Sequence, residues 1–244
     1  MSRPILALAL ALALCSLVGP TAGCHEPGAG SDGRSGLDPE QPPIEGRCDL
    51  RSEGPSDPFA DCVEGFTPAP GVSFGHEALP GIVLGPPRGE GLDMGSTDVV
   101  SLGCGGSITL AFDDPAPTDG PGPDLVVFEN AFVSGATRFV EPGQVLVSED
   151  GIDWYAFPCE PDGEDPLPSG CAGLEPVLAD DEASALDPAS AGGDAFDLAE
   201  LGLAEIHYLR VVDRTREHYG SETWCAGASG GFDLDAVVAL GAGG

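Results

Sequence analysis

The sequence predicts an all-β protein: an antiparallel jelly-roll β-sandwich preceded by a signal peptide and a disordered tether. Three observations support this prediction. Short runs of β-branched and aromatic residues recur from Val72 onward, clusters of Gly and Pro separate them, and helix signals are weak. Short strands at regular spacing with turn residues between them are typical of antiparallel sandwiches and barrels.

The start of the chain predicts export. Arg3 is followed by Ile5–Val18, fourteen residues without a charge, and then by the small-residue segment Pro20–Gly23. This order is typical of a signal peptide, and the apolar run is shorter than the roughly 20 residues that span a membrane. We therefore predict a signal peptide over residues 1–23.

Cys24 directly follows Thr21-Ala22-Gly23, and this segment resembles a bacterial lipoprotein lipobox. The resemblance implies cleavage before Cys24 and its acylation, which would place the protein in the bacterial cell envelope, anchored to a membrane and facing outside the cytoplasm. The alternative is ordinary cleavage near Gly23 that leaves Cys24 as an unmodified thiol. Cysteine parity favours lipid, because an acylated Cys24 leaves six cysteines in the mature chain that can pair.

Residues 24–58 are rich in Pro and Gly and contain almost no large apolar residue. Such a segment cannot bury enough surface to offset its chain entropy, so we expect a flexible tether. Residues 59–244 are long enough for one β-sandwich domain with a sizeable core.

The strands of this domain are predicted in chain order. They are Val72–Phe74, Ile82–Leu84, Asp98–Leu102, Ser107–Phe112, Leu125–Val133, Val145–Glu149, Ile152–Phe157, Ile206–Val212 and Phe232–Leu240. The nearly continuous apolar run Leu125–Val133 is expected of a strand covered on both faces. Asp150-Gly151 predicts a hairpin turn, since this pair tolerates positive φ. Only Asp197–Leu201 looks helical, with Asp197 as its N-cap and Gly202 as its stop.

Six segments, in order, resemble a group of predicted bacterial cell-surface proteins. They are Ala78–Pro87, Ser101–Leu110, Asp124–Phe132, Val145–Trp154, Gly192–Leu198 and Gly231–Val237. The Val-Ser-x-Asp-Gly-x-x-Trp hairpin followed by Tyr208–Val212 is also similar to discoidin-type, galactose-binding-like sandwiches. The resemblance implies a non-catalytic sandwich module, often stabilised by calcium and sometimes glycan-binding.

The charge of the chain limits its partners. It has 41 acidic residues against nine basic ones, a formal net charge of −32. This field repels phosphate backbones, which argues against nucleic-acid binding, and it repels anionic membrane surfaces, so attachment is expected through lipid alone. The expected partners are cations, a surface glycan or another cell-envelope component.

Several carboxylates occur where strands are predicted. Alternation puts Phe232, Leu234, Ala236 and Val238 on one face of the last strand, and Asp233 with Asp235 on the other, roughly 7 Å apart. Such like charges repel unless a cation or an arginine lies between them.

Glu129 and Asn130 interrupt the most apolar predicted strand, where an unpaired carboxylate would be costly. Ca²⁺ prefers six to eight oxygen ligands, so we expect a structural calcium site. Its candidate ligands are Glu129, Asn130, Asp233, Asp235, Asp119, Asp124 and Asp194. The alternatives are a buried pair of Glu129 with Arg210 or Arg138, solvent exposure for Asp233 and Asp235, and a turn role for Asp194.

The segment Asp213–Cys225 joins the last two predicted strands and gathers arginines and aromatic residues. The candidate ligand-binding residues are Arg214, Arg216, His218, Tyr219 and Trp224. Loops at one end of a sandwich commonly bind ligands, and aromatic faces with guanidinium donors suit sugar rings. The alternative is an ordinary long loop whose arginines offset local acids.

Enzyme motifs do not fit their required context. Gly227–Gly231 matches G-x-S-x-G, but a strand instead of a helix is predicted after it, and no histidine follows. We therefore expect no catalytic activity. The alternatives are a purely structural surface lipoprotein and a hydrolase built on another carboxylate pair.

Six cysteines remain for disulfides, and their spacing favours one pattern. Cys159 and Cys171 bracket an acidic loop, and Cys48 and Cys62 lie where the tether meets the domain. Cys104 is then left to pair with Cys225.

Overall fold

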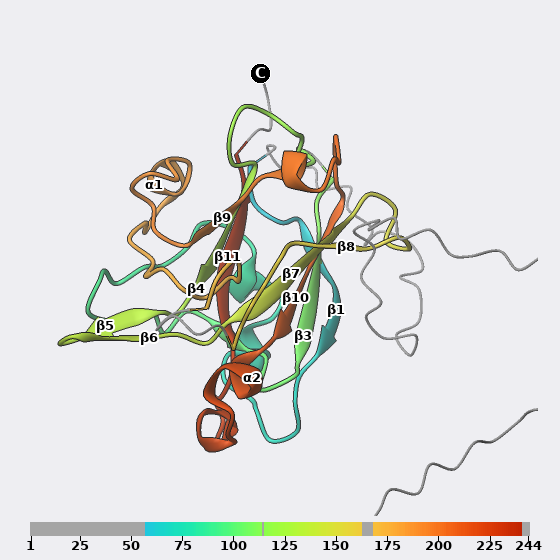
Figure 1. Cartoon of the computed structure of the whole chain (residues 1–244). Coiled ribbons are helices and arrows are strands. Elements are labelled where there is room, and N and C mark those ends of the chain that lie inside the picture. The colour runs from blue at the N-terminus through green and yellow to red at the C-terminus, as the bar shows by residue number, and fades with distance from the viewer. Residues whose placement is uncertain (1–56, 114, 163–167, 241–244) are drawn as a thin grey trace, which may run out of the picture. The chain divides into compact units, whose positions relative to one another are not determined.

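Two antiparallel sheets face each other in the computed structural model of the chain, which describes residues 57–113, 115–162 and 168–240 (Figure 1). The first sheet has the order β1 (Cys62–Thr67), β3 (Ser107–Ala111), β10 (Tyr208–Asp213), β7 (Gly143–Ser148) and β8 (Tyr155–Ala156). The second has the order β2 (Val100–Ser101), β11 (Asp233–Ala239), β4 (Leu125–Glu129) and β9 (Asp194–Phe196). A two-stranded ribbon, β5 (Phe132–Ser134) and β6 (Thr137–Phe139), projects from the second sheet in Figure 1.

All of these strand pairs are antiparallel, so the predicted all-β antiparallel sandwich is confirmed. The helices among the described residues are short. They are α1 (Glu182–Ala185), α2 (Thr215–Tyr219) and the 3₁₀ turns η1 (His76–Ala78), η2 (Gly81–Val83), η3 (Leu198–Glu200) and η4 (Thr223–Cys225). None of the described helices is long and apolar enough to cross a membrane.

The main core lies between the two sheets. Alternate residues of β3, β7 and β10 meet alternate residues of β4 and β11, as in Leu110 and Leu209 on one side and Val127 and Leu234 on the other. Their side chains are completely buried. Interdigitation of two inner faces is what holds a sandwich together.

A second apolar cluster covers the outer face of the four-stranded sheet. Val126 and Phe128 of β4 pack there against Phe59 and against Val177. Val177 belongs to the segment that leads into α1, and Ala185 of α1 is part of the same cluster. Strand β4 is therefore buried on both faces, as its continuous apolar sequence predicts.

Strand β11 contains a bulge that changes its alternation. The pairing with β4 shifts register between Leu234 and Ala236. Leu234 and Val237 consequently face the main core, whereas Ala236 and Val238 face the outer cluster. The prediction that Ala236 and Val238 share a face with Leu234 is wrong, because a bulge places one extra residue in the strand.

Four other local predictions also differ from the structure. Val72–Phe74 is irregular and not a strand, and Ser73 and Phe74 both donate to the Ala228 carbonyl. Gly81–Val83 is a 3₁₀ turn. The run Leu125–Val133 is divided into β4 and β5 at Asn130-Ala131. Asp197 does cap a helical turn by accepting from the Ala199 amide, but that turn is 3₁₀.

Disulfides fasten both ends of long loops. Cys104 bonds to Cys225 and Cys159 to Cys171, as the spacing predicts. Cys62 is also disulfide-bonded, but its predicted partner Cys48 lies outside the described residues. The predicted signal peptide, the lipidation residue Cys24 and the tether up to residue 56 lie outside them as well.

Candidate functional site

Three consecutive backbone amides at the start of β11 each donate to a different buried carboxylate. The pairs are Gly231 with Glu141 (2.9 Å), Phe232 with Asp213 (2.7 Å) and Asp233 with Glu129 (3.2 Å). Together with the side chain of Asp233, these acids form what we call the carboxylate cluster: Glu129, Glu141, Asp213 and Asp233. Each of the four is at most 4% exposed.

Elements from both sheets position this cluster. Glu129 ends β4, Asp213 ends β10, Asp233 begins β11, and Glu141 follows the ribbon strand β6. Asp213 is fully satisfied, because its two oxygens accept from Gly105, Thr215 and Phe232. Asp213 therefore has a structural role: it holds the beginning of the loop that leads to α2.

Asp233 connects the cluster to β2 and β4. Its Oδ1 accepts from the Ser101 hydroxyl, and its Oδ2 accepts from the Asn130 side-chain amide at 3.3 Å. Asn130 and Glu129 are thus brought next to Asp233, as the sequence predicts.

Two oxygen atoms in this region have no hydrogen-bond partner. They are Oε2 of Glu129 and Oδ1 of Asn130, both buried. An unsatisfied buried acceptor costs free energy on the order of 1–3 kcal/mol, and a charged one costs more. Such atoms in a folded protein call for a physical explanation, such as a bound ion, a bound water or a functional role.

Burial and mutual repulsion raise the pKa values of the cluster. The pKa of Glu129 lies well above its usual range, first because of desolvation and then because of Glu141 and Asp233. Desolvation, Asp233 and Asp213 raise the pKa of Glu141 to about 9. Desolvation raises the pKa of Asp233 to about 6, although the Ser101 and Asn130 hydrogen bonds oppose the shift.

The arginine alternative for Glu129 is wrong. Arg138 contacts the carboxylate of Glu175 and the carbonyl of Leu174. Arg210 donates to Thr109, and its guanidinium carbon lies 4.1 Å from the centroid of the Trp154 ring. Neither side chain neutralises the cluster.

The other predicted calcium ligands lie elsewhere. Asp235 accepts from the Arg88 amide through both oxygens at 3.1 Å. Asp194 accepts from the backbone amides of Gly173 and Leu174 at 2.8 and 2.9 Å, which is the turn role considered above as its alternative. Neither residue has a hydrogen bond to the carboxylate cluster among the described contacts.

Asp119 and Asp124 form a separate group with Asp197. One carboxylate oxygen of each lies within 4.8 Å of the others. Asp124 precedes β4 and Glu129 ends it, so this group and the carboxylate cluster lie at opposite ends of that strand, roughly 17 Å apart. Both oxygens of Asp124 already accept from backbone amides, of Gly120 and Leu198.

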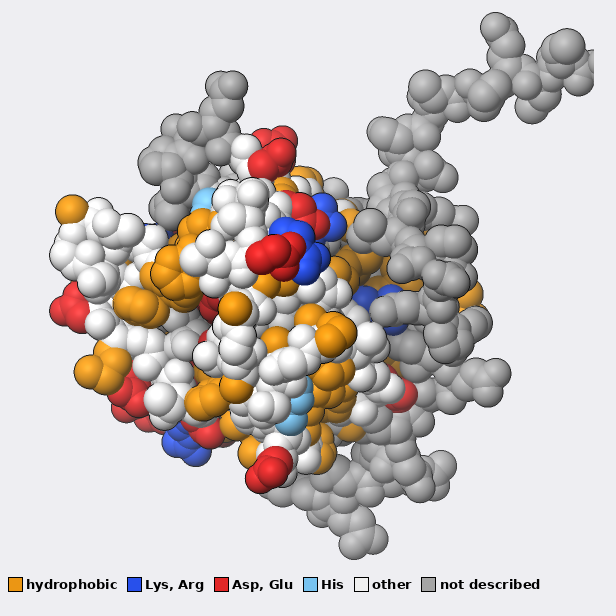
Figure 2. Space-filling model, turned by 90° about the horizontal axis from the view of Figure 1, so that it is seen from below, with side chains coloured by type: hydrophobic (Ala, Val, Ile, Leu, Met, Phe, Trp, Pro, Cys, Tyr) orange, Lys and Arg blue, Asp and Glu red, His pale blue; other side chains and the backbone are white. Residues whose placement is uncertain are grey.

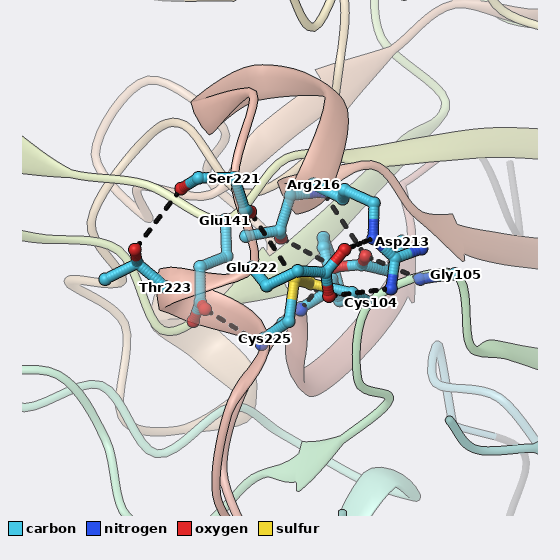
Figure 3. The surroundings of a disulfide bond; sticks show 12 residues. Cys104, Gly105, Glu141, Asp213, Arg216, Ser221, Glu222, Thr223 and Cys225 are labelled. Carbon is cyan, nitrogen blue, oxygen red and sulfur yellow. Dashed lines mark hydrogen bonds and ion pairs between the residues drawn. A yellow bond between two sulfur atoms is a disulfide. The ribbon is translucent and has the colours of Figure 1, made fainter. Parts of the chain in front are cut away.

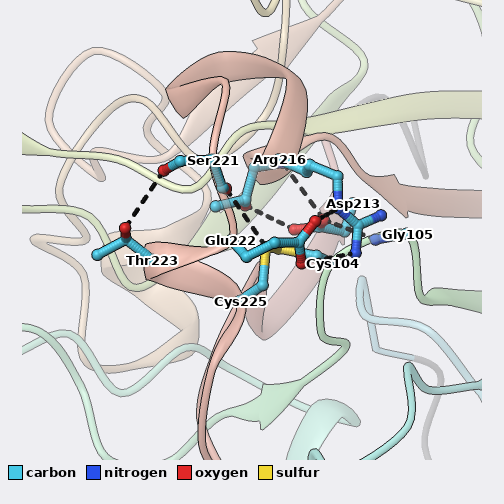
Figure 4. Close-up of polar contacts among 9 residues, drawn as sticks. Cys104, Gly105, Asp213, Arg216, Ser221, Glu222, Thr223 and Cys225 are labelled. Atoms are coloured by element: carbon cyan, nitrogen blue, oxygen red, sulfur yellow. Dashed lines mark hydrogen bonds and ion pairs between the residues drawn. A yellow bond between two sulfur atoms is a disulfide. The ribbon is translucent and has the colours of Figure 1, made fainter.

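The predicted binding loop lies next to Glu141 and Asp213 of the carboxylate cluster and is tied to Cys104 by the Cys104–Cys225 disulfide (Figure 3). Its arginines pair within the loop. Arg216 binds both oxygens of Glu222, at 2.5 and 3.1 Å (Figure 4), and Arg214 lies 3.5 Å from Glu217. The alternative role, in which these arginines offset local acids, describes them better than ligand binding.

Five aromatic rings in sequential contact form what we call the aromatic ledge: Phe132, Phe139, Trp224, Tyr219 and His218. The centroid distances along it are 5.0, 5.0, 5.5 and 4.5 Å. Trp224 is 43% exposed. The Tyr219 hydroxyl donates to the carbonyl of Val140, the residue before Glu141, and so links the ledge to the cluster.

The ledge lies at the end of the sandwich that carries α2. Seen from that end, hydrophobic side chains are spread among neutral groups, and charged side chains occur only in small groups (Figure 2). The high net negative charge of the chain is therefore not concentrated on this face.

Sequence reasoning missed four residues of these features: Glu141, Asp213, Phe132 and Phe139. Glu141 follows the apolar pair Phe139-Val140 and precedes Pro142-Gly143. A carboxylate between apolar residues and a strand is a signal that could have identified it.

Comparison with known proteins adds no assignment. No family model matches the chain, and no curated protein matches it either.

Proposed function

We propose that this chain is a non-catalytic, exported β-sandwich module that is tethered to the bacterial cell surface through a lipid on Cys24 and binds a neutral glycan with the aromatic ledge. The lipobox-like segment and the cysteine parity support the tether. The resemblance to cell-surface and galactose-binding-like sandwiches supports the class of module. A detergent-partitioning comparison of the native chain with Cys24→Ser tests the lipid.

The observation that carries the binding proposal is the exposed indole of Trp224. Trp224 is 43% exposed, so the folded chain forgoes much of the free energy that burial of a large aromatic side chain provides. Phe139 and Tyr219 contact the indole and hold it in one orientation. A rigid aromatic face binds at little entropic cost, and it suits the apolar face of a sugar ring.

The arrangement of charges favours a neutral ligand. Arg216 and Arg214 are paired with Glu222 and Glu217, so their charges are offset within the loop. The chain as a whole carries a net charge of −32, which repels anions. A neutral oligosaccharide has no charge to be repelled, and its hydroxyls can still bond to the polar groups around the ledge.

The positions of the histidines and of Ser229 support a non-catalytic role. Ser229 lies in an exposed turn between η4 and β11 and not at a strand-to-helix elbow. His76, His207 and His218 are each bonded to a backbone carbonyl, of Ser101, Phe112 and Pro161.

The test is binding of the purified protein to an array of neutral oligosaccharides. Trp224→Ala is expected to weaken binding at least about tenfold, about 1.4 kcal/mol. Ile152→Ala is the matched control, because Ile152 is 66% exposed in the β7–β8 turn, outside the ledge. Loss of binding in both variants, or no binding by the native chain, would contradict the proposal and favour a purely structural lipoprotein.

A further inference from the structure

We propose that Glu129, Glu141, Asp233 and Asn130 bind one Ca²⁺ ion at the base of the loop that carries Tyr219 and Trp224 of the aromatic ledge. The site does not depend on the glycan proposal, because it rests on the carboxylate cluster alone. It differs from the predicted calcium site in two ways: it includes Glu141, and it leaves out Asp235, Asp194, Asp119 and Asp124.

The first support is the set of unpartnered oxygens. Glu129 is 1% exposed, and its Oε2 has no hydrogen-bond partner. Oδ1 of the neighbouring Asn130 is buried without a partner too. Two buried acceptors in adjacent residues, both beside Asp233, are satisfied by a cation or by a hydrogen-bond donor and not by another acceptor.

The second support is the lack of a compensating side chain. The groups that act on Glu129 and Glu141 most strongly, apart from desolvation, are other acids. Arg138, Arg210 and Arg214 each pair elsewhere. A buried cluster of like charges is otherwise relieved only by binding protons, and a divalent ion relieves it while the carboxylates stay ionised.

The donor atoms select calcium. All of the named donors are carboxylate or amide oxygens, which are the ligands of hard cations and not of zinc or copper. Three carboxylates and one amide carry seven oxygens, and Ca²⁺ takes six to eight. Of the seven, Oε2 of Glu129 and Oδ1 of Asn130 have no hydrogen bond, whereas both oxygens of Asp233 already accept one. They come from three separate elements and form an irregular set, whereas Mg²⁺ demands near-ideal octahedral geometry.

The site also determines what the ion would do. Glu141 accepts from Gly231 at the end of the loop, and Asp213 accepts from Thr215 at its start (Figure 3 labels Glu141 and Asp213). Tyr219 of the ledge donates to Val140, next to Glu141. A cation held by Glu129, Glu141 and Asp233 would therefore fix the base of the loop and the orientation of the ledge.

The experiment is calorimetric titration of the chelator-treated protein with Ca²⁺, together with thermal melts in Ca²⁺ and in chelator. We expect one ion per chain and a melting temperature that rises by roughly 5–10 °C at a hundredfold excess over Kd. Mg²⁺ is expected to give a much smaller rise. Glu129→Gln and Glu141→Gln keep the shape of the side chain, and each is expected to weaken binding at least tenfold.

Asp119→Asn is the matched control, because it removes one carboxylate from the competing group at the other end of β4. Binding that is lost in Asp119→Asn and kept in Glu129→Gln would overturn the proposal. An identical melting curve of the native protein in chelator and in millimolar Ca²⁺ would overturn it as well.

A second readout covers the case in which Glu129→Gln fails to fold. Tb³⁺, a probe for calcium sites, emits when a nearby indole or phenol is excited. Tyr219 donates to the carbonyl of Val140, the residue before Glu141, and the ring of Trp224 contacts that of Tyr219. The native protein should show this emission, and Ca²⁺ should displace it. If Tb³⁺ emission is unchanged in the double variant Trp224→Phe, Tyr219→Phe, the ion binds elsewhere and the proposed site is wrong.

Discussion

Glu141 and Gly231 are 90 residues apart in the sequence, yet the Glu141 carboxylate accepts the Gly231 amide hydrogen at 2.9 Å. This bond joins the segment after β6 to the start of β11 and closes the loop that carries α2 and η4. Gly231 adopts a φ of 75°, which brings its backbone against Gly103 and Cys104.

Gly231→Ala should therefore lower the free energy of unfolding by at least about 2 kcal/mol, since it adds left-handed strain and a steric overlap. A Cβ at this position would lie 2.6 Å from the Gly103 carbonyl carbon. The matched control is Gly227→Ala, where φ is also positive but no atom lies within 4 Å. Denaturant titration should show a clearly larger loss for Gly231→Ala, and equal losses would contradict the role of the close approach.

Removing the Cys104–Cys225 disulfide should be strongly destabilising. The bond closes 121 residues of sequence, and the chain-entropy model predicts a cost of up to roughly 5 kcal/mol for Cys104→Ala with Cys225→Ala. The same change at Cys159 and Cys171, which are 12 residues apart, should cost up to roughly 3 kcal/mol. Urea denaturation of the two double variants measures the difference. A Cys104→Ala, Cys225→Ala variant as stable as the native chain would refute the prediction.

Asp194 provides a pH prediction. Burial raises its pKa to about 7, against the backbone amides that donate to it. The protonated acid is thus favoured in the folded state, so this residue's contribution to stability is fully present below about pH 4 and is lost as the pH rises through 7. Asp194→Asn keeps an oxygen for the backbone amides and does not titrate.

The melting temperature of Asp194→Asn relative to the native chain should therefore rise between pH 4 and pH 8. Parallel thermal melts across this range measure the difference. A relative melting temperature that falls with pH would mean that Asp194 is ionised and stabilised by its amide donors.

Calcium should protect the loop from trypsin. The chain has nine basic residues in total, so its tryptic sites are few, and Arg216 lies in α2 with a side chain 49% exposed. Opening of the loop base in chelator should speed cleavage after Arg216, because proteases cut segments that unfold locally. Cleavage after Arg88, whose side chain is 57% exposed, should change much less.

The fragments separate only after reduction, because Cys225 is bonded to Cys104. Mass spectrometry of reduced digests at equal protease activity therefore gives the two rates. Equal rates of cleavage after Arg216 with and without Ca²⁺ would mean that no cation site stabilises the loop.

Much of the fold follows from local pattern. Alternation and turn residues locate the central strands, and the unbroken apolar run of β4 predicts burial on both faces. Pattern does not predict the conformation of Val72–Phe74, because the amides of Ser73 and Phe74 donate to the Ala228 carbonyl far along the chain. Nor does it predict the bulge in β11, which depends on pairing with β4.

The candidate site is predictable only in part for the same reason. Glu129, Asn130 and Asp233 are conspicuous because each breaks an apolar strand. Glu141 lies in a connection, and it becomes part of the cluster only through the hydrogen bond to Gly231. The aromatic ledge likewise combines a loop near the end of the chain with the β5–β6 ribbon, a contact that no local spacing encodes.

The most direct test is a crystal structure grown with Ca²⁺, with the ion located by its anomalous scattering or by that of Tb³⁺ in its place. We predict one strong peak bounded by Glu129, Glu141 and Asp233, with an oxygen of Asn130 in its coordination shell. A peak found only among Asp119, Asp124 and Asp197, or no peak at either end of β4, would contradict the account.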